Sequence, residues 1–203
     1  MSRRFTGERL VLATHNNGKL EEFVALLGLP GTAVLSAGAL GLSVPAETEE
    51  SFLGNARIKA RTAAMASGLP ALADDSGLEV EGLGGQPGVH TADWAEGPDG
   101  RDFVMAMERV HQQLMAKAVP QPWRARFRCL LVLAWPDGHE EVAEGICEGS
   151  LVWPRRGADG HGFDPMFRPE GHDLTFAEMP FSLKNRLSHR ARAVGILRQQ
   201  CFT

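Results

Sequence analysis

The sequence lacks the features that mark several large classes of protein. None of its 203 residues belongs to a stretch long and apolar enough to span a membrane, so no membrane partner is expected. Basic residues precede Phe5, but no apolar core follows them, so we expect no secretory signal and a cytoplasmic protein. A large excess of positive charge is also missing. The net charge of -4 argues against nonspecific nucleic-acid binding, and no nucleic-acid partner is expected.

Cysteine is scarce as well. Cys129, Cys147 and Cys201 are an odd number without metal-type spacing, which predicts reduced thiols rather than a disulfide framework. Internal repeats and low-complexity segments are absent. The composition, with 43% hydrophobic and 23% charged residues, is typical of a soluble globular chain that buries a core. One domain over residues 1–203, with two lobes, is the simplest interpretation.

The most informative segment runs from Thr14 to Lys19. It follows an apolar run, 10–13, and precedes an amphipathic run, 20–27, an order that predicts strand, loop and helix. The free N–H groups at the start of such a helix, together with Lys19, favour a phosphate group. An ordinary turn closed by Asn and Gly fits the same residues equally well. Leu20 follows the lysine, so the hydroxyl of a Walker A loop is missing and any metal must be held elsewhere.

Carboxylates for such a metal follow a second apolar run, 71–73. Asp74 and Asp75 are expected at the end of this strand, where α/β folds usually place their chemistry. Neighbouring residues of an extended chain face opposite sides, so one acid would reach a metal while the other makes a supporting or base contact. Such hard oxygen ligands suit Mg²⁺, and Glu47, Glu49 and Glu50 offer further ones. A plain Asp-Asp-Ser-Gly turn and an acidic first turn of a helix are the alternatives.

Residue periodicity predicts further elements. Helices are expected from 51 to 67 and from 102 to 117, and a hairpin from 124–135 and 140–152. The first hairpin strand carries alternating arginines and the second carries acids, namely Arg124, Arg126 and Arg128 against Glu140, Glu141, Glu144 and Glu148. Pairing between these two strands is expected, in preference to a nucleic-acid patch.

The C-terminal part holds a Gly-rich loop, 160–165, and then a basic stretch from Lys184 to Arg190. An apolar stripe continues through this stretch to Leu197, which predicts one helix with Arg186 and Arg190 as neighbours one turn apart. Basic residues near a helix end are often only a solvated face.

Six motifs occur in a fixed order between about Arg9 and Leu197. They are Thr14-x-Asn16-x-x-Lys19, Asn55-Ala56-x-x-Lys59-Ala60, Ala73-Asp74-Asp75-Ser76-Gly77-Leu78, Gly84-Gly85-x-Pro87-Gly88, Gly162-Phe163-Asp164-Pro165 and Ser188-His189-Arg190. Each motif is weak alone, but their order and spacing resemble one family. That family is the non-canonical purine nucleoside triphosphate pyrophosphatases, the inosine and xanthosine triphosphatases.

The resemblance implies an α/β fold with an elongated mixed central sheet and flanking helices, forming two lobes around a cleft, usually as a homodimer. It implies Mg²⁺-dependent hydrolysis of ITP, dITP and XTP to the monophosphate and pyrophosphate. The implied catalytic residues are Asp75, as proton acceptor, Lys19 and Lys59. The implied metal-binding residues are Glu47, Asp75 and Asp74. The implied substrate-binding residues are Thr14, His15, Asn16, Asn17, Gly18 and Lys19 for the triphosphate, and Ser76, His161, Gly162, Phe163, Asp164, Lys184, His189 and Arg190 for the nucleotide, the last two at the base.

Two positions depart from the family pattern. Gly54 stands where the family usually has Glu, so a carboxylate near the metal is missing or is replaced by Glu49 or Glu50. His161 stands where the family often has an aromatic residue that stacks on the base. Three alternative hypotheses remain. They are a Maf-like pyrophosphatase with another base preference, a nucleotide-binding protein without turnover, and a magnesium nuclease.

Overall fold

A computed structural model describes residues 2–30 and 33–202 of the chain. The chain divides into two compact units. Unit 1 consists of Met1–Asp75, Cys129–Gly145 and Arg190–Thr203, and unit 2 of Ser76–Arg128 and Ile146–His189. Within the described residues, no helix is long and apolar enough to cross a membrane.

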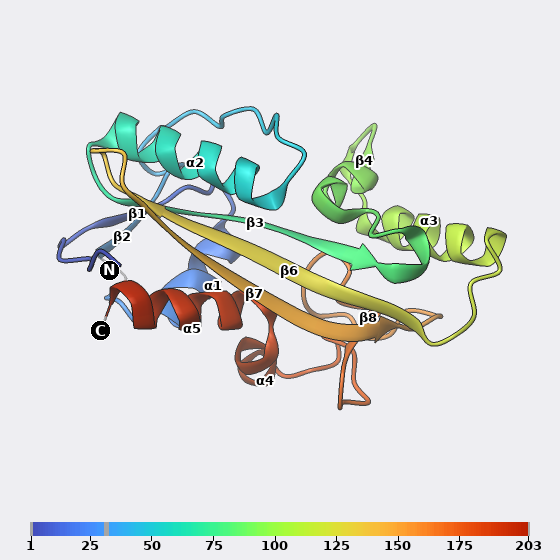
Figure 1. Cartoon of the computed structure of the whole chain (residues 1–203). Helices are drawn as coiled ribbons and strands as arrows, with labels where there is room; N and C mark the ends of the chain where they lie inside the picture. The colour runs from blue at the N-terminus through green and yellow to red at the C-terminus, as the bar shows by residue number, and fades with distance from the viewer. Residues whose placement is uncertain (1, 31–32, 203) are drawn as a thin grey trace. The chain divides into compact units, whose positions relative to one another are not determined.

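A mixed sheet forms the framework of the chain (Figure 1). Strand β1 (Leu10–Leu12) pairs in parallel with β2 (Val34–Ser36) and with β3 (Ala71–Val80). The order of the six strands is β2-β1-β3-β6-β7-β8, and β8 runs antiparallel to β7. The last three strands are β6 (Trp123–Ala134), β7 (Glu140–Leu151) and β8 (Phe167–Pro169). The predicted α/β fold with a mixed sheet and flanking helices is therefore confirmed, as are both strands of the predicted hairpin.

The helices of unit 1 begin at capping residues. Helix α1 (Asn17–Leu27) begins after Asn16, whose side chain accepts a hydrogen bond from the Lys19 N–H. Helix α2 (Phe52–Ser67) begins after Ser51, whose Oγ accepts from the Gly54 N–H. Such caps satisfy N–H groups that have no partner within the helix. The predicted helix over 51–67 is confirmed.

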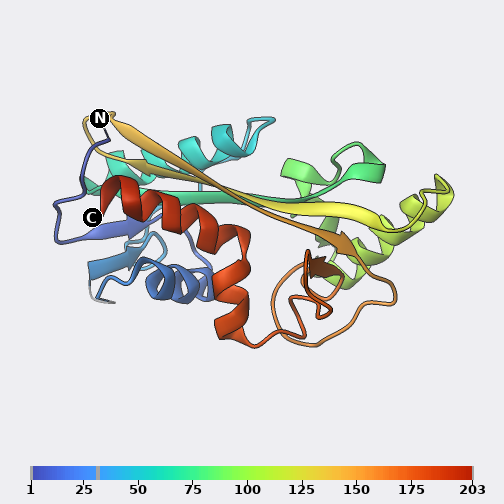
Figure 2. The ribbon, with the colours of Figure 1, turned by 60° about the horizontal axis from the view of Figure 1, so that its bottom comes forward.

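Unit 1 buries both faces of its sheet, because successive side chains of its strands alternate between two apolar layers. Ala71 and Ala73 pack with the alanines of α2, whereas Leu72, between them, packs with residues of α1 and α5 (His189–Cys201). Figures 1 and 2 show α2 on one side of these strands and α1 and α5 on the other. The two faces of β3 therefore look toward different helices.

Unit 2 is organised around a core rich in aromatic residues. Helix α3 (Phe103–Ala116), capped by Asp102, contributes Met107 and Val110 to this core, so the predicted helix over 102–117 is confirmed and Met107 is a packing residue. The unit also contains the short elements η2 (Glu81–Leu83), η3 (Gly88–His90), η4 (Asp93–Ala95), β4 (Glu96–Gly97), β5 (Gly100–Arg101) and α4 (Phe181–Leu187).

Strand β3 contradicts one prediction. Asp74 and Asp75 lie in the middle of a ten-residue strand rather than at its end. The strand continues because Leu78 and Val80 restore the apolar pattern after Gly77 and are buried in the core of unit 2. The two acids are thus held by regular extended backbone, not by a turn.

The single C-terminal helix was also a wrong prediction. Ser188, with φ -64° and ψ 156°, has extended backbone and separates α4 from α5. The apolar stripe is divided accordingly: Leu187 packs against the core of unit 2, whereas Val194 lies in a core of unit 1. Arg186 and Arg190 therefore belong to two different helices.

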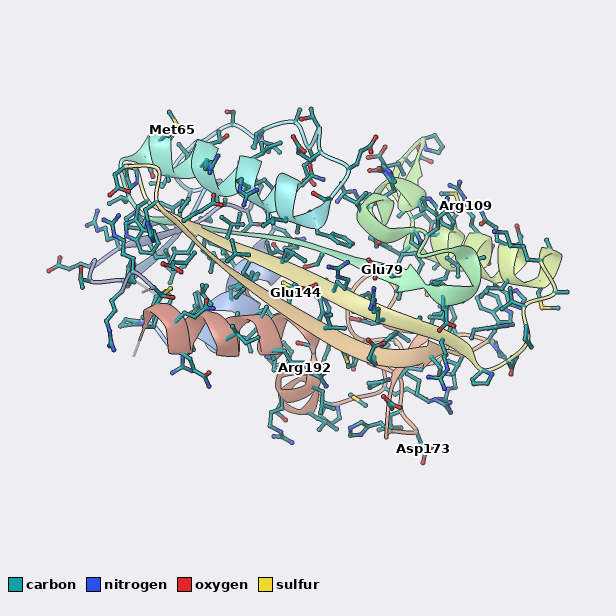
Figure 3. All side chains as sticks on the ribbon, in the orientation of Figure 1. Met65, Glu79, Arg109, Glu144, Asp173 and Arg192 are labelled. Carbon is teal, nitrogen blue, oxygen red and sulfur yellow. The ribbon has the colours of Figure 1, made fainter. Side chains whose placement is uncertain are left out.

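Two arginines of β6 have a carboxylate partner that was not predicted. Arg126 Nε lies 2.6 Å from Glu79 Oε2, and Arg128 Nη1 lies 3.0 Å from Glu79 Oε1. Glu79 belongs to β3, which neighbours β6 in the sheet, and it is labelled in Figure 3. Of the predicted acids, Glu148 lies 4.0 Å from Arg126, while Glu140 pairs with arginines of α2. The predicted pairing is thus present between Arg126 and Glu148, whereas Glu79 was missed because the periodicity of the sequence does not show that β3 is the other neighbour of β6.

Candidate active site

The loop between β1 and α1 is shorter than predicted, because α1 already begins at Asn17. Asn16 Oδ1 accepts a hydrogen bond from the Lys19 N–H at 3.1 Å, and Thr14 Oγ1 accepts from the Asn16 N–H at 3.2 Å. His15 Nε2 lies 2.8 Å from the carbonyl oxygen of Leu42, which fixes the ring against a neighbouring loop. The segment thus presents a capped helix start with Gly18 and Lys19 in its first turn. The side chain of Asn17 lies outside the described part of the structure.

Asp74 forms an ion-pair cluster on the face of β3 that looks toward α1 and α5. Lys19 Nζ lies 3.0 Å from Asp74 Oδ1 and 3.1 Å from Oδ2. Arg190 Nε, at the start of α5, lies 3.6 Å from Asp74 Oδ2. The predicted phosphate-binding lysine and the predicted base-binding arginine thus contact the same buried carboxylate.

Asp75 forms a second cluster on the α2 face of the same strand. Lys59 Nζ, from α2, lies 2.8 Å from Asp75 Oδ1 and 3.3 Å from Glu47 Oε1. The other oxygen, Asp75 Oδ2, is buried and has no hydrogen-bond partner among the described residues. The expectation that the neighbouring acids face opposite sides is therefore confirmed by their partners.

The two acids have opposite pKa shifts. Burial alone would raise the pKa of Asp74, but the positive charges of Lys19, Arg190 and Lys59 outweigh it and hold that pKa far below its ordinary value. Burial raises the pKa of Asp75 to about 6, although Lys59 opposes the shift; the negative charges of Glu47 and Asp74 add to it. Burial lowers the pKa of Lys59, but Asp75, Asp74 and Glu47 together raise it above its ordinary value. Asp74 is thus a fixed anion, whereas Asp75 takes up and releases a proton near pH 6 in the metal-free protein.

The chemistry of the second cluster fits a magnesium ion. Mg²⁺ is usually held by one or two carboxylates, with waters and substrate phosphates completing its shell. Glu47 and Asp75 share one lysine, and the buried Asp75 Oδ2 lacks a hydrogen-bond partner in the described structure. No group of three His, Cys, Asp or Glu side chains that could hold a metal occurs among the described residues. Asp74 is therefore not brought together with Glu47 and Asp75 as a third ligand.

The predicted residues of unit 2 gather around Asp164. Its Oδ2 accepts a hydrogen bond from Lys184 Nζ at 2.5 Å and another from the His161 N–H at 2.6 Å. Asp164 and Lys184 are both buried, while the side chain of His161 is exposed. The carboxylate of Asp164 therefore fixes the Gly-rich loop to α4 and has its Oδ2 occupied by protein donors.

The remaining predicted residues of unit 2 differ in their surroundings. His189 is buried and stacks on Phe127, with ring centroids 4.8 Å apart and an interplanar angle of 15°. Phe163 lies in the core and meets Phe103 edge to face, so its side chain serves packing. Ser76 is half-buried on β3, and Gly162 has a φ of +65°, which favours glycine.

One charged residue of the first cluster was missed in the sequence. Glu22 of α1 is buried, and its Oε2 accepts a hydrogen bond from Arg190 Nη1 at 3.0 Å. In the sequence, Glu22 looks like a solvent-exposed acid on the polar face of an amphipathic helix. The available signal was its position three residues after Lys19, on the same helical face.

The fold and these clusters define an α/β protein whose buried aspartates Asp74, Asp75 and Asp164 each pair with a lysine. Comparison with known proteins specifies the family: a model of the Ham1 family matches residues 10–200. The chain belongs to the Ham1 family.

Curated relatives match over nearly the whole length. The chain is 59% identical over 202 residues to the dITP/XTP pyrophosphatase of Ruegeria pomeroyi, covering 100% of this chain and 99% of the relative. It is 52% identical over 200 residues to the protein of the same name from Rhodospirillum centenum, covering 98% of each.

Solved structures agree with the family assignment. The fold matches the structure of a HAM1 protein from Coxiella burnetii with a TM-score of 0.85 and 33% identity, covering 95% of this chain and 98% of that one. It matches a dITP/XTP pyrophosphatase from Mycobacterium abscessus with a TM-score of 0.75 and 34% identity, covering 93% and 98% of the two chains.

Proposed function

We propose that this protein hydrolyses the non-canonical purine nucleotides dITP, ITP and XTP to the monophosphate and pyrophosphate, and thereby removes them from the nucleotide pool. Two dITP/XTP pyrophosphatases match 100% and 98% of the chain at 59% and 52% identity. The observation that carries the proposal is Asp75, a buried carboxylate bound to Lys59, with a raised pKa and one oxygen without a hydrogen-bond partner in the described structure. The family match favours this activity over the Maf-like and nuclease alternatives.

The triphosphate carries several negative charges, which Lys19 and the first N–H groups of α1 are suited to bind. Lys19 is now paired with Asp74, so a bound phosphate would compete with that carboxylate for its ammonium group. Arg190 also contacts Asp74 and keeps the carboxylate balanced when Lys19 turns to the substrate.

Asp75 is the proposed proton acceptor for the attacking water. In the metal-free protein burial raises the pKa of Asp75 to about 6, and general bases work best when their pKa lies near the working pH. Lys59 holds Asp75 Oδ1 at 2.8 Å, so Oδ2 is the oxygen open to the metal ion or to the attacking water. Lys59 also offers positive charge to the phosphoryl group as charge develops on its oxygens.

Glu47 and Asp75 are the residues that would hold Mg²⁺. When bound, the ion supplies charge neutralisation at the phosphate oxygens and lowers the pKa of a coordinated water. Asp74 remains a supporting acid that orients Lys19 and Arg190. Removal of Mg²⁺ with EDTA is expected to stop turnover.

Base recognition is assigned to His189 and Arg190, the two residues that the resemblance to the family implies. Hypoxanthine and xanthine carry a carbonyl oxygen at position 6, where adenine carries an amino donor. Donors from His189 and Arg190 would pair with the carbonyl, and an adenine would leave them without partners. A site built on buried hydrogen bonds rejects such a mismatch by roughly 10⁴-fold.

The specificity assay incubates the protein with dITP, XTP, GTP and ATP, each with and without Mg²⁺. Turnover of dITP and XTP that requires Mg²⁺ and exceeds that of ATP and GTP supports the proposal. Equal turnover of all four nucleotides would contradict the base selectivity. Binding of dITP without turnover would favour a nucleotide-binding protein instead.

A homodimer and a cytoplasmic location also belong to the proposal, since the resemblance to the family implies the first and the sequence predicts the second. Light scattering on the purified protein tests the dimer: a mass near twice 22.0 kDa supports it, and a mass near 22.0 kDa contradicts it.

A further inference from the structure

Glu49 packs against Gly54 at the start of α2. A Cβ atom built on Gly54 would lie 2.5 Å from Glu49 Cβ and 2.7 Å from Glu49 Cγ. Both atoms belong to the stem of the glutamate rather than to its flexible end. A side chain at position 54 would therefore force the backbone near Glu49 to move.

The same segment is fastened to α2 by hydrogen bonds. The Glu49 N–H donates to Asn55 Oδ1 at 3.0 Å, and Asn55 is only 3% exposed. The Gly54 N–H donates to Ser51 Oγ at 3.1 Å. Steric fit at Gly54 and hydrogen bonding at Asn55 thus fix the backbone at Glu49 from two sides.

Glu47 lies two residues before this fixed point. Two residues of extended chain span at most about 7 Å, so a shift of the backbone at Glu49 is transmitted directly to Glu47. The Glu47 carboxylate lies 3.3 Å from Lys59 Nζ, and its side chain is 44% exposed. An exposed carboxylate with an ion pair of this length depends on its backbone to stay beside Lys59 and Asp75.

We propose that Glu49 and Gly54 are a matched pair of positioning residues: the Glu49 stem occupies the space above Gly54 and thereby holds Glu47 beside Lys59 and Asp75. The metal-binding role of Glu47 in this inference rests on the proposed function. The pair also explains the departure from the family pattern at position 54, because the space for a side chain there is taken by residue 49.

The test measures Mn²⁺ binding to the purified protein by EPR of the free ion, without nucleotide. Gly54→Ala is expected to weaken Mn²⁺ binding by about tenfold or more, the usual effect of disturbing groups that orient a metal ligand. Gly195→Ala is the matched control, since Gly195 is also helical and a Cβ there meets no atom within 4 Å. It should leave Mn²⁺ binding unchanged.

The decisive variant combines Gly54→Ala with Glu49→Gly. Removal of the Glu49 stem takes away the two closest atoms that the new Cβ would meet and leaves only Ser51 Oγ, at 3.0 Å, so the double variant should bind Mn²⁺ more tightly than Gly54→Ala alone. Unchanged Mn²⁺ binding in Gly54→Ala, or a double variant no better than the single one, would overturn the inference.

Thermal unfolding in EDTA separates this inference from the proposed function. A Gly→Ala change inside a helix ordinarily raises stability. Gly54→Ala should instead lower the midpoint temperature of unfolding, and adding Glu49→Gly in the double variant should restore that temperature. If these shifts occur while the unaltered protein neither binds Mn²⁺ nor hydrolyses dITP, the proposed function fails and the packing of Glu49 on Gly54 stands. If the unaltered protein is active and Gly54→Ala binds Mn²⁺ normally, the positioning role fails alone.

Discussion

Arg190 Nη1 donates a hydrogen bond to Glu22 Oε2 at 3.0 Å and so joins the first turn of α5 to the middle of α1. The side chains of Arg190 and Glu22 are only 16% and 12% exposed. Through Arg190, Glu22 is connected to Asp74 and from there to Lys19, so four charged residues act as one network. A substitution of Glu22 should therefore alter the surroundings of Asp74 and Lys19.

Glu22→Ala should therefore destabilise the protein, because it removes one of the two carboxylates that pair with the partly buried Arg190. Loss of one partner of a buried ion pair costs about 3 kcal/mol or more in free energy of unfolding. Glu22→Gln should cost less, since its amide oxygen still accepts from Arg190. Urea unfolding measures both values. Equal stability of Glu22→Ala and the unaltered protein would show that the network contributes nothing.

Asp75→Asn should lower kcat for dITP by about 10³-fold, because an amide cannot accept the proton of the attacking water. The fold should survive, since Asn keeps the volume and one oxygen for Lys59. Steady-state kinetics measure kcat, and circular dichroism checks the fold. A loss below tenfold in a folded variant would rule out Asp75 as the base.

Stability should depend on pH through Asp75. In the metal-free folded protein its pKa is raised from 3.8 to about 6, so between these values the folded state holds a proton that the unfolded chain has released. The free energy of unfolding contributed by this group therefore falls as pH rises through that window, by about 3 kcal/mol. Asp75→Asn lacks this titration.

The measurement compares urea unfolding of the unaltered protein and of Asp75→Asn in EDTA at pH 4 and pH 7. The unaltered protein should lose stability relative to the variant as the pH rises. Asp74, whose pKa is lowered, acts in the opposite direction below its ordinary value, but it is present in both proteins. A constant difference between the two proteins would contradict the raised pKa.

Asp164→Ala should weaken substrate binding more than turnover. The change removes the acceptor that anchors the His161 N–H and the partner of the buried Lys184. We expect KM for dITP to rise by about tenfold and the free energy of unfolding to fall by about 3 kcal/mol. Asp99→Ala, at an exposed loop position, is the control. A fall in kcat at constant KM would place Asp164 in catalysis instead.

Residue periodicity is enough to predict the elements whose apolar residues all face one core. Helices α2 and α3 belong to this group, and both begin and end within one residue of the prediction. The predicted strand ends too early at Asp74 and Asp75, because these two acids interrupt the apolar pattern of β3. In the structure each acid is buried beside a cation. A buried acid looks like a turn residue until its partner is known, and the partners Lys19 and Lys59 lie 55 and 16 residues away.

The candidate site could be assembled from motifs only in part. Asp75, Lys59 and Glu47 were named together and meet in the structure. Glu22 and the contact of Arg190 with Asp74 were missed, because they depend on how α1 and α5 cover the same face of the sheet. The interruption between α4 and α5 at Ser188 was missed for a related reason. The apolar stripe is continuous in the sequence, but its residues pack into two different cores.

The most direct test of the account is ³¹P NMR of the products formed from dITP with Mg²⁺, by the unaltered protein and by Asp75→Asn. We expect pyrophosphate and the monophosphate as the only products of the unaltered protein, and almost none of either from the variant. Orthophosphate with the diphosphate, or undiminished pyrophosphate from the folded variant, would contradict it.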